Sequence, residues 1–197
     1  MSARTRPATW ALLVMVLGLP SCSLLTPRPV TTPPPQPPHG VLRLPTVPGY
    51  PGEVAAVQSI HVVRGDQIAD VDAVLEVSAP RLVLVLAQPL GPRLATIDWS
   101  ADGVAIQRGS GPPAAAALQP EDVLADLMLA FWPEPAVRSS LRPGLTLMSL
   151  PDRRLVMRDD AVLVEVRRDD VDPWNGTVRL DNHQIGYQLT IVSRAGS

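Results

Sequence analysis

Hydrophobic and polar side chains alternate along most of the chain beyond residue 52. In residues 71–77 the odd positions are apolar, whereas the even positions include Asp72 and Glu76. In residues 187–191 the even positions are again the polar ones. Because successive side chains of a strand point to opposite faces, this period of two predicts antiparallel strands with one wet face.

Turn signals such as Asp102-Gly103 and Asn175-Gly176 separate these segments from one another. Ten strands are predicted, at residues 55–64, 70–78, 81–88, 93–100, 103–108, 145–150, 153–158, 161–167, 177–181 and 185–193. Residues 81–87 and 162–166 are apolar at almost every position. Strands of that kind need cover on both faces, so we expect other elements to cover the concave side of the sheet there.

One segment between the two groups of strands has the period of a helix. Its apolar side chains recur at i, i+3, i+4 and i+7 and form one stripe, made of Leu124, Leu127, Met128 and Phe131. Pro120 suits the first turn of a helix and Pro133 ends it. A short second helix is predicted over residues 135–141. The fold class is therefore mainly β, with one or two helices that cover the sheet.

Composition limits the class of protein. The chain has 197 residues, of which 46% are hydrophobic and 4% aromatic, and its formal net charge is −2. After an export segment and a proline-rich stretch, enough chain remains for one packed domain. The charge argues against nucleic acid as a partner. The single cysteine excludes an internal disulfide framework and a cysteine-cluster metal site, and we expect no cofactor.

The N-terminus has the pattern of a secretory signal. Arg4 and Arg6 precede an unbroken apolar run over residues 10–19, which is too short to span a bilayer. The run ends in Leu19-Pro20-Ser21-Cys22, which resembles the lipobox of bacterial lipoproteins. That resemblance implies that residues 1–21 are removed and that Cys22 carries the acyl chains, palmitate among them. The alternative is an ordinary secreted protein with an incidental cysteine.

The residues after Cys22 indicate a membrane localisation and a tether. Ser23 follows the cysteine, where bacterial lipoproteins retained at the inner membrane usually have Asp. The resemblance thus implies the outer membrane, with the body facing the periplasm. Residues 27–51 contain ten prolines, which favour an extended polyproline II tether. The expected plan is a signal peptide (1–21), a lipidated cysteine with its tether (22–51) and a β-rich domain (52–197).

Two resemblances to known families extend this prediction. Strands over residues 79–90 and 94–107, followed by a helix that ends in Phe131-Trp132-Pro133, resemble the LolA/LolB lipoprotein carriers. That resemblance implies an incomplete, curved antiparallel barrel that a helix plugs, with an apolar cavity for acyl chains. Residues 172–176, 180–183 and 186–191 resemble a family of small uncharacterised Gram-negative lipoproteins, whose genes often lie beside aryl-polyene synthesis genes.

The leading hypothesis is a receptor that binds the acyl chain of a lipid or lipidated molecule and helps to transfer or insert it. The expected lining of its cavity comprises Leu84, Leu86, Trp99, Leu127, Phe131, Trp132 and Tyr187. The same residues could instead pack against each other as a closed core. A second hypothesis is a structural or assembly lipoprotein, in which a sheet edge or the Trp174 loop holds another envelope protein.

An enzyme is the third hypothesis and the one with the least support. Asp181 and His183 would share one face of a strand, but no G-x-S-x-G nucleophile elbow accompanies them. The acidic pair Asp159-Asp160 and the run at residues 169–172 lack the ligand spacing of a calcium loop. We therefore expect solvated turns at these positions, no metal site and no catalytic residues.

Overall fold

The computed structural model describes residues 40–109 and 119–196, all of which belong to one compact unit. The expected signal peptide, the acyl attachment site Cys22 and the larger part of the proline-rich tether lie outside the described residues. Among the described residues, no helix has the length and apolar character needed to cross a membrane.

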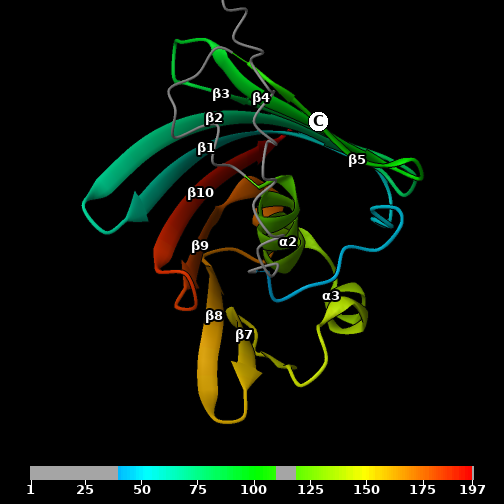
Figure 1. The fold of residues 1–197 in the computed structure, drawn as a ribbon, viewed down its shortest axis with the longest axis vertical. Coiled ribbons are helices and arrows are strands. Elements are labelled where there is room, and N and C mark those ends of the chain that lie inside the picture. The colour runs from blue at the N-terminus through cyan, green and yellow to red at the C-terminus, as the bar shows by residue number, and fades with distance from the viewer. Residues whose placement is uncertain (1–39, 110–118, 197) are drawn as a thin grey trace, which may run out of the picture. The chain divides into compact units, whose positions relative to one another are not determined.

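Ten strands form a single antiparallel sheet whose order is β5-β4-β3-β2-β1-β10-β9-β8-β7-β6 (Figure 1). The strands are β1 (Val54–Arg64), β2 (Gln67–Val77), β3 (Leu82–Ala87), β4 (Arg93–Ser100), β5 (Gly103–Arg108), β6 (Thr146–Ser149), β7 (Arg153–Arg158), β8 (Ala161–Arg168), β9 (Thr177–Asn182) and β10 (Tyr187–Ala195). The sequence prediction of ten antiparallel strands is confirmed. The sheet is not closed into a barrel, because β5 and β6 are its two edges and do not pair with each other.

Pairing of β1 with β10 joins the two ends of the domain. Ile60 lies opposite Ile191, and Gln58 lies opposite Ser193. The side chains that alternate into the concave face are the buried ones, as the burial pattern of β2 shows at Ala73, Leu75 and Val77. The period of two in the sequence thus identifies the inward face of these strands correctly.

The predicted cover on the concave side of β3 is present, whereas the convex side of the strand is only partly covered. Leu82, Leu84 and Leu86 are buried on the concave side, but Val83 and Val85 are only half-buried on the convex side. The apolar convex positions are partly shielded by their neighbours within the sheet, so no second layer of described residues is needed there.

The described residues between β5 and β6 form two helices, α2 (Pro120–Phe131) and α3 (Glu134–Ser140). Figure 1 shows α2 within the curve of the sheet, against the concave face. The helix carries more than the predicted apolar stripe, since nine of its twelve residues are buried, Asp126 among them. An ionisable side chain on such a helix must find partners inside the protein.

Two arginines hold the C-terminal end of α2. Arg154 Nη1 donates to the carbonyl oxygen of Leu129 at 2.9 Å, and Arg168 Nη2 donates to that of Ala130 at 2.8 Å. The last carbonyl groups of a helix have no partner within it, and cations there also offset the helix dipole. These contacts fix the helix against β7 and β8.

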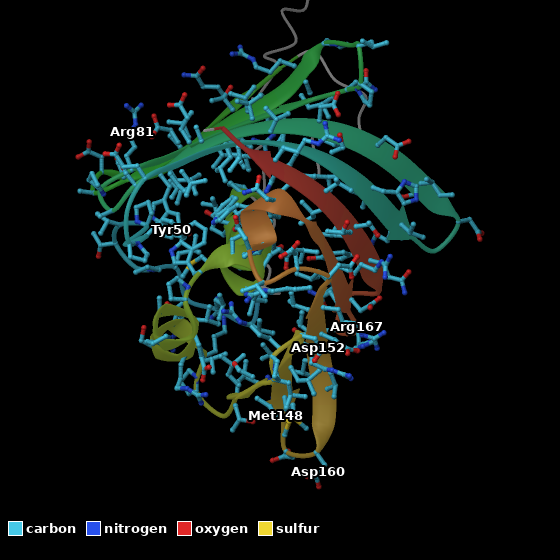
Figure 2. The ribbon with its side chains drawn as sticks, turned by 180° about the vertical axis from the view of Figure 1, so that it is seen from behind. Tyr50, Arg81, Met148, Asp152, Asp160 and Arg167 are labelled. Atoms are coloured by element: carbon cyan, nitrogen blue, oxygen red, sulfur yellow. The ribbon has the colours of Figure 1, made fainter. Side chains whose placement is uncertain are left out.

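Residues 40–51, which the sequence assigns to the tether, pack against the domain. Val41 and Leu42 are buried, and Leu42 forms an antiparallel bridge with Leu141. Tyr50 (Figure 2) accepts a hydrogen bond on its hydroxyl from Trp174 Nε1 at 2.8 Å. Proline limits regular hydrogen bonding but leaves the apolar residues between the prolines free to be buried.

Candidate functional site

A cavity of about 240 Å³ lies between α2 and the concave face of the sheet. Its walls are mainly aliphatic and come from β1, β2, β3, β10 and α2. The apolar side chains that line it on these elements are Ile60, Val62, Val71, Leu84, Leu86, Val123, Leu127, Leu189 and Ile191. The volume exceeds the ~150 Å³ of an engineered apolar cavity that holds benzene. It lies just below the ~300 Å³ at which pockets for drug-sized ligands begin. One short alkyl chain fits such a space.

Burial gives the cavity a closed end and an open end. Along β1 the lining runs from Gln58, which is 1% exposed, through half-buried Ile60 to exposed Arg64. At ~3.3 Å per residue, this stretch of strand is about 20 Å long. Leu86 lies at the same closed end, because it pairs with Ala73 of β2, and Ala73 pairs with Gln58 of β1. An elongated apolar ligand can therefore lie along β1 with one end near solvent.

A chain of hydrogen bonds crosses the cavity wall. The Tyr187 hydroxyl donates to Asp126 Oδ2 on α2 and accepts from Asn182 Nδ2 at 3.4 Å. Asn182 Oδ1 in turn accepts from the backbone N–H groups of Gln184, at 3.1 Å, and Ile185, at 3.3 Å. The helix over the cavity is thereby tied to the hairpin that joins β9 and β10.

Burial shifts the pKa values of this pair. Desolvation raises the pKa of Asp126 to about 7, opposed by the Tyr187 hydrogen bond and assisted by the nearby charge of Asp122. Desolvation and the proximity of Asp126 raise the pKa of Tyr187, which therefore stays protonated and remains the donor. A carboxyl group with this pKa changes charge near neutral pH.

A second polar pair lies at the closed end of the cavity. Gln58 Nε2 donates to Ser193 Oγ at 2.9 Å. Gln58 Oε1 is also buried, but it accepts no hydrogen bond from any described residue. A buried carbonyl without a donor is costly, so this oxygen marks a place where a ligand can contribute one.

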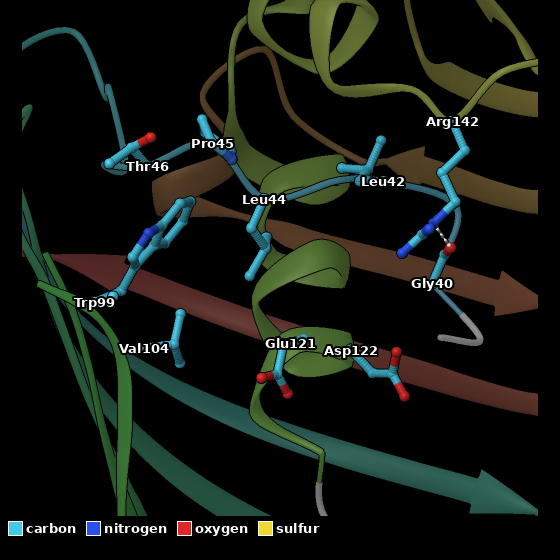
Figure 3. A pocket seen from close by; sticks show the side chains of 11 residues that line it. Gly40, Leu42, Leu44, Pro45, Thr46, Trp99, Val104, Glu121, Asp122 and Arg142 are labelled. Carbon is cyan, nitrogen blue, oxygen red and sulfur yellow. Dashed lines mark hydrogen bonds between the residues drawn. The ribbon is translucent and has the colours of Figure 1, made fainter. Parts of the chain in front are cut away.

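The structure brings together four of the seven side chains expected to line a cavity. These four are Leu84, Leu86, Leu127 and Tyr187. Trp99 lies elsewhere, in a pocket of about 350 Å³ beside the 40–46 segment and the N-terminal turn of α2 (Figure 3). Arg142 Nε donates there to the carbonyl oxygen of Gly40 at 2.8 Å, an interaction that holds the segment in place (Figure 3).

Phe131 and Trp132 belong to an aromatic cluster rather than to the cavity. Phe131 stacks on Trp174 with ring centroids 4.2 Å apart, and Tyr50 meets Trp132 edge-on at 5.1 Å. Trp132 is fully buried and donates through Nε1 to the carbonyl oxygen of Pro48 at 2.7 Å. Trp174, which the sequence leaves open as a core anchor or an exposed contact, is 5% exposed and so belongs to the core.

Sequence reasoning missed the polar residues of the cavity, although each interrupts an apolar pattern. Gln58 stands between Ala56 and Ile60 on the inward face of β1. Asp126 lies four residues after Asp122 in a helix that is otherwise apolar from Val123 to Phe131. A polar residue on a predicted buried face is the signal that points to such a position.

Asp181 and His183 form no hydrogen bond with each other in the described part of the chain. His183 donates its backbone N–H to the carbonyl oxygen of Leu163 at 2.9 Å, and its side chain is exposed. Asp159 and Asp160 are exposed, and Figure 2 shows Asp160 at the tip of the β7–β8 hairpin. No group of His, Cys, Asp and Glu suited to a metal ion occurs among residues 40–109 and 119–196.

Comparison with known proteins adds one match. The model of a family described as "Protein of unknown function (DUF3261)" matches residues 55–195, a span that runs from β1 to the end of β10. A search of the curated proteins finds no match to the chain. The match therefore spans the ten strands, both described helices and the cavity between α2 and the sheet.

Proposed function

The chain belongs to the DUF3261 family of proteins of unknown function, and from that premise we propose that its domain binds the alkyl chain of a lipid or lipidated molecule. The observation that carries the proposal is the aliphatic cavity of about 240 Å³ beneath α2. Each methylene group that leaves water for such a cavity contributes ~0.8 kcal/mol, so even a short chain gains enough to bind.

The proposed occupant lies along β1, with its polar end near Arg64 and its alkyl part toward the closed end. Arg64 is exposed and lines the open end of the cavity, where a carboxylate or phosphate headgroup remains in water. The unclosed antiparallel sheet with a helix on its concave face supports a carrier of the LolA/LolB type. Such a receptor moves its ligand without a catalytic step.

The proposal includes an anchor on Cys22. The lipobox-like sequence around this single cysteine supports acylation. Ser23 supports localisation to the outer membrane, with the domain in the periplasm. Two or more acyl chains hold a protein stably on a bilayer, because a single chain gives only marginal binding. The receptor would then deliver or accept its ligand at the inner leaflet of the outer membrane.

Filling the cavity tests the binding proposal. Ile60 is half-buried and lines the cavity, so Ile60→Trp places a large ring in the space of the ligand. Val57 lies on the same strand, on the convex face, and is 58% exposed, which makes Val57→Trp the matched control. We expect Ile60→Trp to weaken binding of a fluorescent fatty acid by about tenfold or more, and Val57→Trp to bind as the unmodified chain does.

Two outcomes would count against the binding proposal. The first is that the unmodified chain binds no fatty-acid probe and carries no lipid in native mass spectrometry. The second is that Ile60→Trp binds the probe as tightly as Val57→Trp does, which would show that the probe lies outside the cavity. Circular dichroism of both variants establishes that the sheet is retained.

Acylation is tested separately in a Gram-negative host. The unmodified chain should incorporate labelled palmitate and fractionate with the outer membrane, and Cys22→Ser should do neither. Labelling that persists in Cys22→Ser would refute the anchor, but it would leave the binding proposal untouched.

A convex-face contact with another envelope protein is the second candidate function. Val57 and Val74 face each other across β1 and β2 on the convex side and are 58% and 50% exposed. Val192 on the neighbouring β10 is 43% exposed. Exposed apolar side chains that gather on one sheet favour a protein partner. A photo-crosslinker at Val74 would recover a protein partner in cells if this function holds, and none if it does not.

A further inference from the structure

One buried polar atom distinguishes this cavity from a simple alkyl-chain pocket. Gln58 is 1% exposed, lines the cavity, and lies on the inward face of β1 between apolar neighbours. Its amide nitrogen is used, because Nε2 donates to Ser193 Oγ at 2.9 Å. Its carbonyl oxygen receives no hydrogen bond from the residues that the structure describes.

A saturated alkyl chain would leave this oxygen unpaired. Burying a carbonyl without a donor forfeits the hydrogen bond it makes to water, and methylene groups supply no replacement. A hydroxyl group is small, uncharged and a donor, so it can enter an apolar cavity and pair with a carbonyl oxygen. Sites built to hydrogen-bond a ligand hydroxyl reject analogues that lack it, because the polar group of the site is then left unpaired.

We propose that the cavity selects an alkyl chain that carries a hydroxyl group, which donates a hydrogen bond to Gln58 Oε1 at the closed end. The position of Gln58 sets where the hydroxyl lies. Arg64 is at the open end and Gln58 lies six residues away on the same strand, about 20 Å at ~3.3 Å per residue. The hydroxyl is therefore on the part of the chain remote from a charged headgroup.

The surroundings of Gln58 strengthen the selection. Leu84, Leu86 and Ile191 are buried lining residues at this end, and the hydrogen bond therefore forms away from water. Ser193 is 2% exposed and holds the amide nitrogen, which fixes the side-chain orientation before a ligand arrives. A preorganised acceptor in a dry site discriminates more strongly than a mobile acceptor at the surface.

This inference rests on the proposed function, and three matched probes separate the two. Dodecanoate has an alkyl end, ω-hydroxydodecanoate has a donor there, and ω-methoxydodecanoate has an oxygen without a donor. Their dissociation constants are measured by calorimetry on the full chain carrying Cys22→Ser, which removes the proposed acyl chains. We expect the hydroxylated probe to bind about tenfold tighter than the other two, because only it pairs with Gln58 Oε1.

A variant at the acceptor completes the experiment. Gln58→Leu keeps the size of the side chain and removes the carbonyl, so the preference for the hydroxylated probe over dodecanoate should disappear. Equal binding of all three probes to the Cys22→Ser chain would overturn the hydroxyl inference and leave the alkyl-chain proposal standing. A preference for the hydroxylated probe that survives Gln58→Leu would have the same meaning, and so would equally tight binding of the methoxy probe. Failure of every probe would overturn both. If Gln58→Leu does not fold, the comparison of the three probes on the Cys22→Ser chain decides the inference.

Discussion

The Tyr187 hydroxyl at the start of β10 donates a hydrogen bond to Asp126 Oδ2 on α2, across 61 positions of sequence. This bond connects the helix that covers the cavity to the last hairpin of the sheet. Both side chains line the cavity. The covering helix is therefore held by a polar contact that depends on the protonation state of one carboxyl group.

Asp126 should make the stability of the domain depend on pH. Its pKa rises from 3.8 to about 7 on folding, so the folded state binds more protons than the unfolded chain between these values. The contribution of Asp126 to the free energy of unfolding is therefore greatest below pH 3.8, and it falls as the pH rises to about 7. At ~1.4 kcal/mol per pKa unit, the loss amounts to about 4 kcal/mol.

Asp126→Asn removes this titration. Urea unfolding at a series of pH values from 4 to 8 should show a fall in the free energy of unfolding for the unmodified chain, and a flatter profile for the variant. Asp122→Asn keeps the Asp126 carboxyl, so this variant should retain the pH dependence, with a smaller fall because the charge of Asp122 helps to raise the pKa of Asp126. Parallel profiles for the unmodified chain and Asp126→Asn would contradict the prediction.

Tyr187→Phe should loosen α2. The substitution keeps the ring but removes the hydroxyl, which leaves the buried Asp126 carboxyl without its donor at a cost of ~1–3 kcal/mol. Because the Tyr187 hydrogen bond lowers the pKa of Asp126, its loss should also raise that pKa further. Urea unfolding measures the stability, and faster amide hydrogen exchange within α2 should accompany the loss. Unchanged exchange in the helix would show that this hydrogen bond does not hold it.

Tyr50→Phe tests whether the segment before β1 is part of the domain. Trp174 Nε1 loses its acceptor, the Tyr50 hydroxyl at 2.8 Å, while the edge-on ring contacts of Tyr50 remain possible. Leaving that N–H group unpaired should lower the free energy of unfolding by ~1–3 kcal/mol. The pH profile should keep its shape, because Asp126 is untouched. A stability equal to that of the unmodified chain would mean that water replaces the lost acceptor.

The pair Gln58 and Ser193 should contribute little to stability. Gln58 Oε1 is buried without a donor in the described residues, so the pair carries a desolvation cost that one hydrogen bond offsets only partly. The double variant Gln58→Leu/Ser193→Ala removes both polar partners at once, which is nearly neutral or stabilising for buried pairs. Thermal unfolding should therefore give a melting temperature equal to or above that of the unmodified chain. A large decrease would assign the pair to the architecture rather than to ligand recognition.

Local sequence patterns predict most of the strands and helices of the domain. The period of two in segments such as 71–77 predicts which side chains face inward, because adjacent residues of any strand point to opposite faces. Proline at both ends similarly predicts α2 to within two residues. The expected cover on the concave face of β3 is present, whereas its convex face is only partly covered.

The sequence by itself determined the strands, the helices and the class of fold, since these follow from interactions between residues close along the chain. Only the tertiary structure decided which apolar residues border a cavity and which pack together. Leu84 and Phe131 have the same character in sequence, but one lines the cavity and the other stacks on Trp174. The partners of Asp126 and Gln58 lie 61 and 135 positions away, and no local pattern encodes the spacing between a helix and a sheet. That spacing depends on how the side chains of distant segments pack.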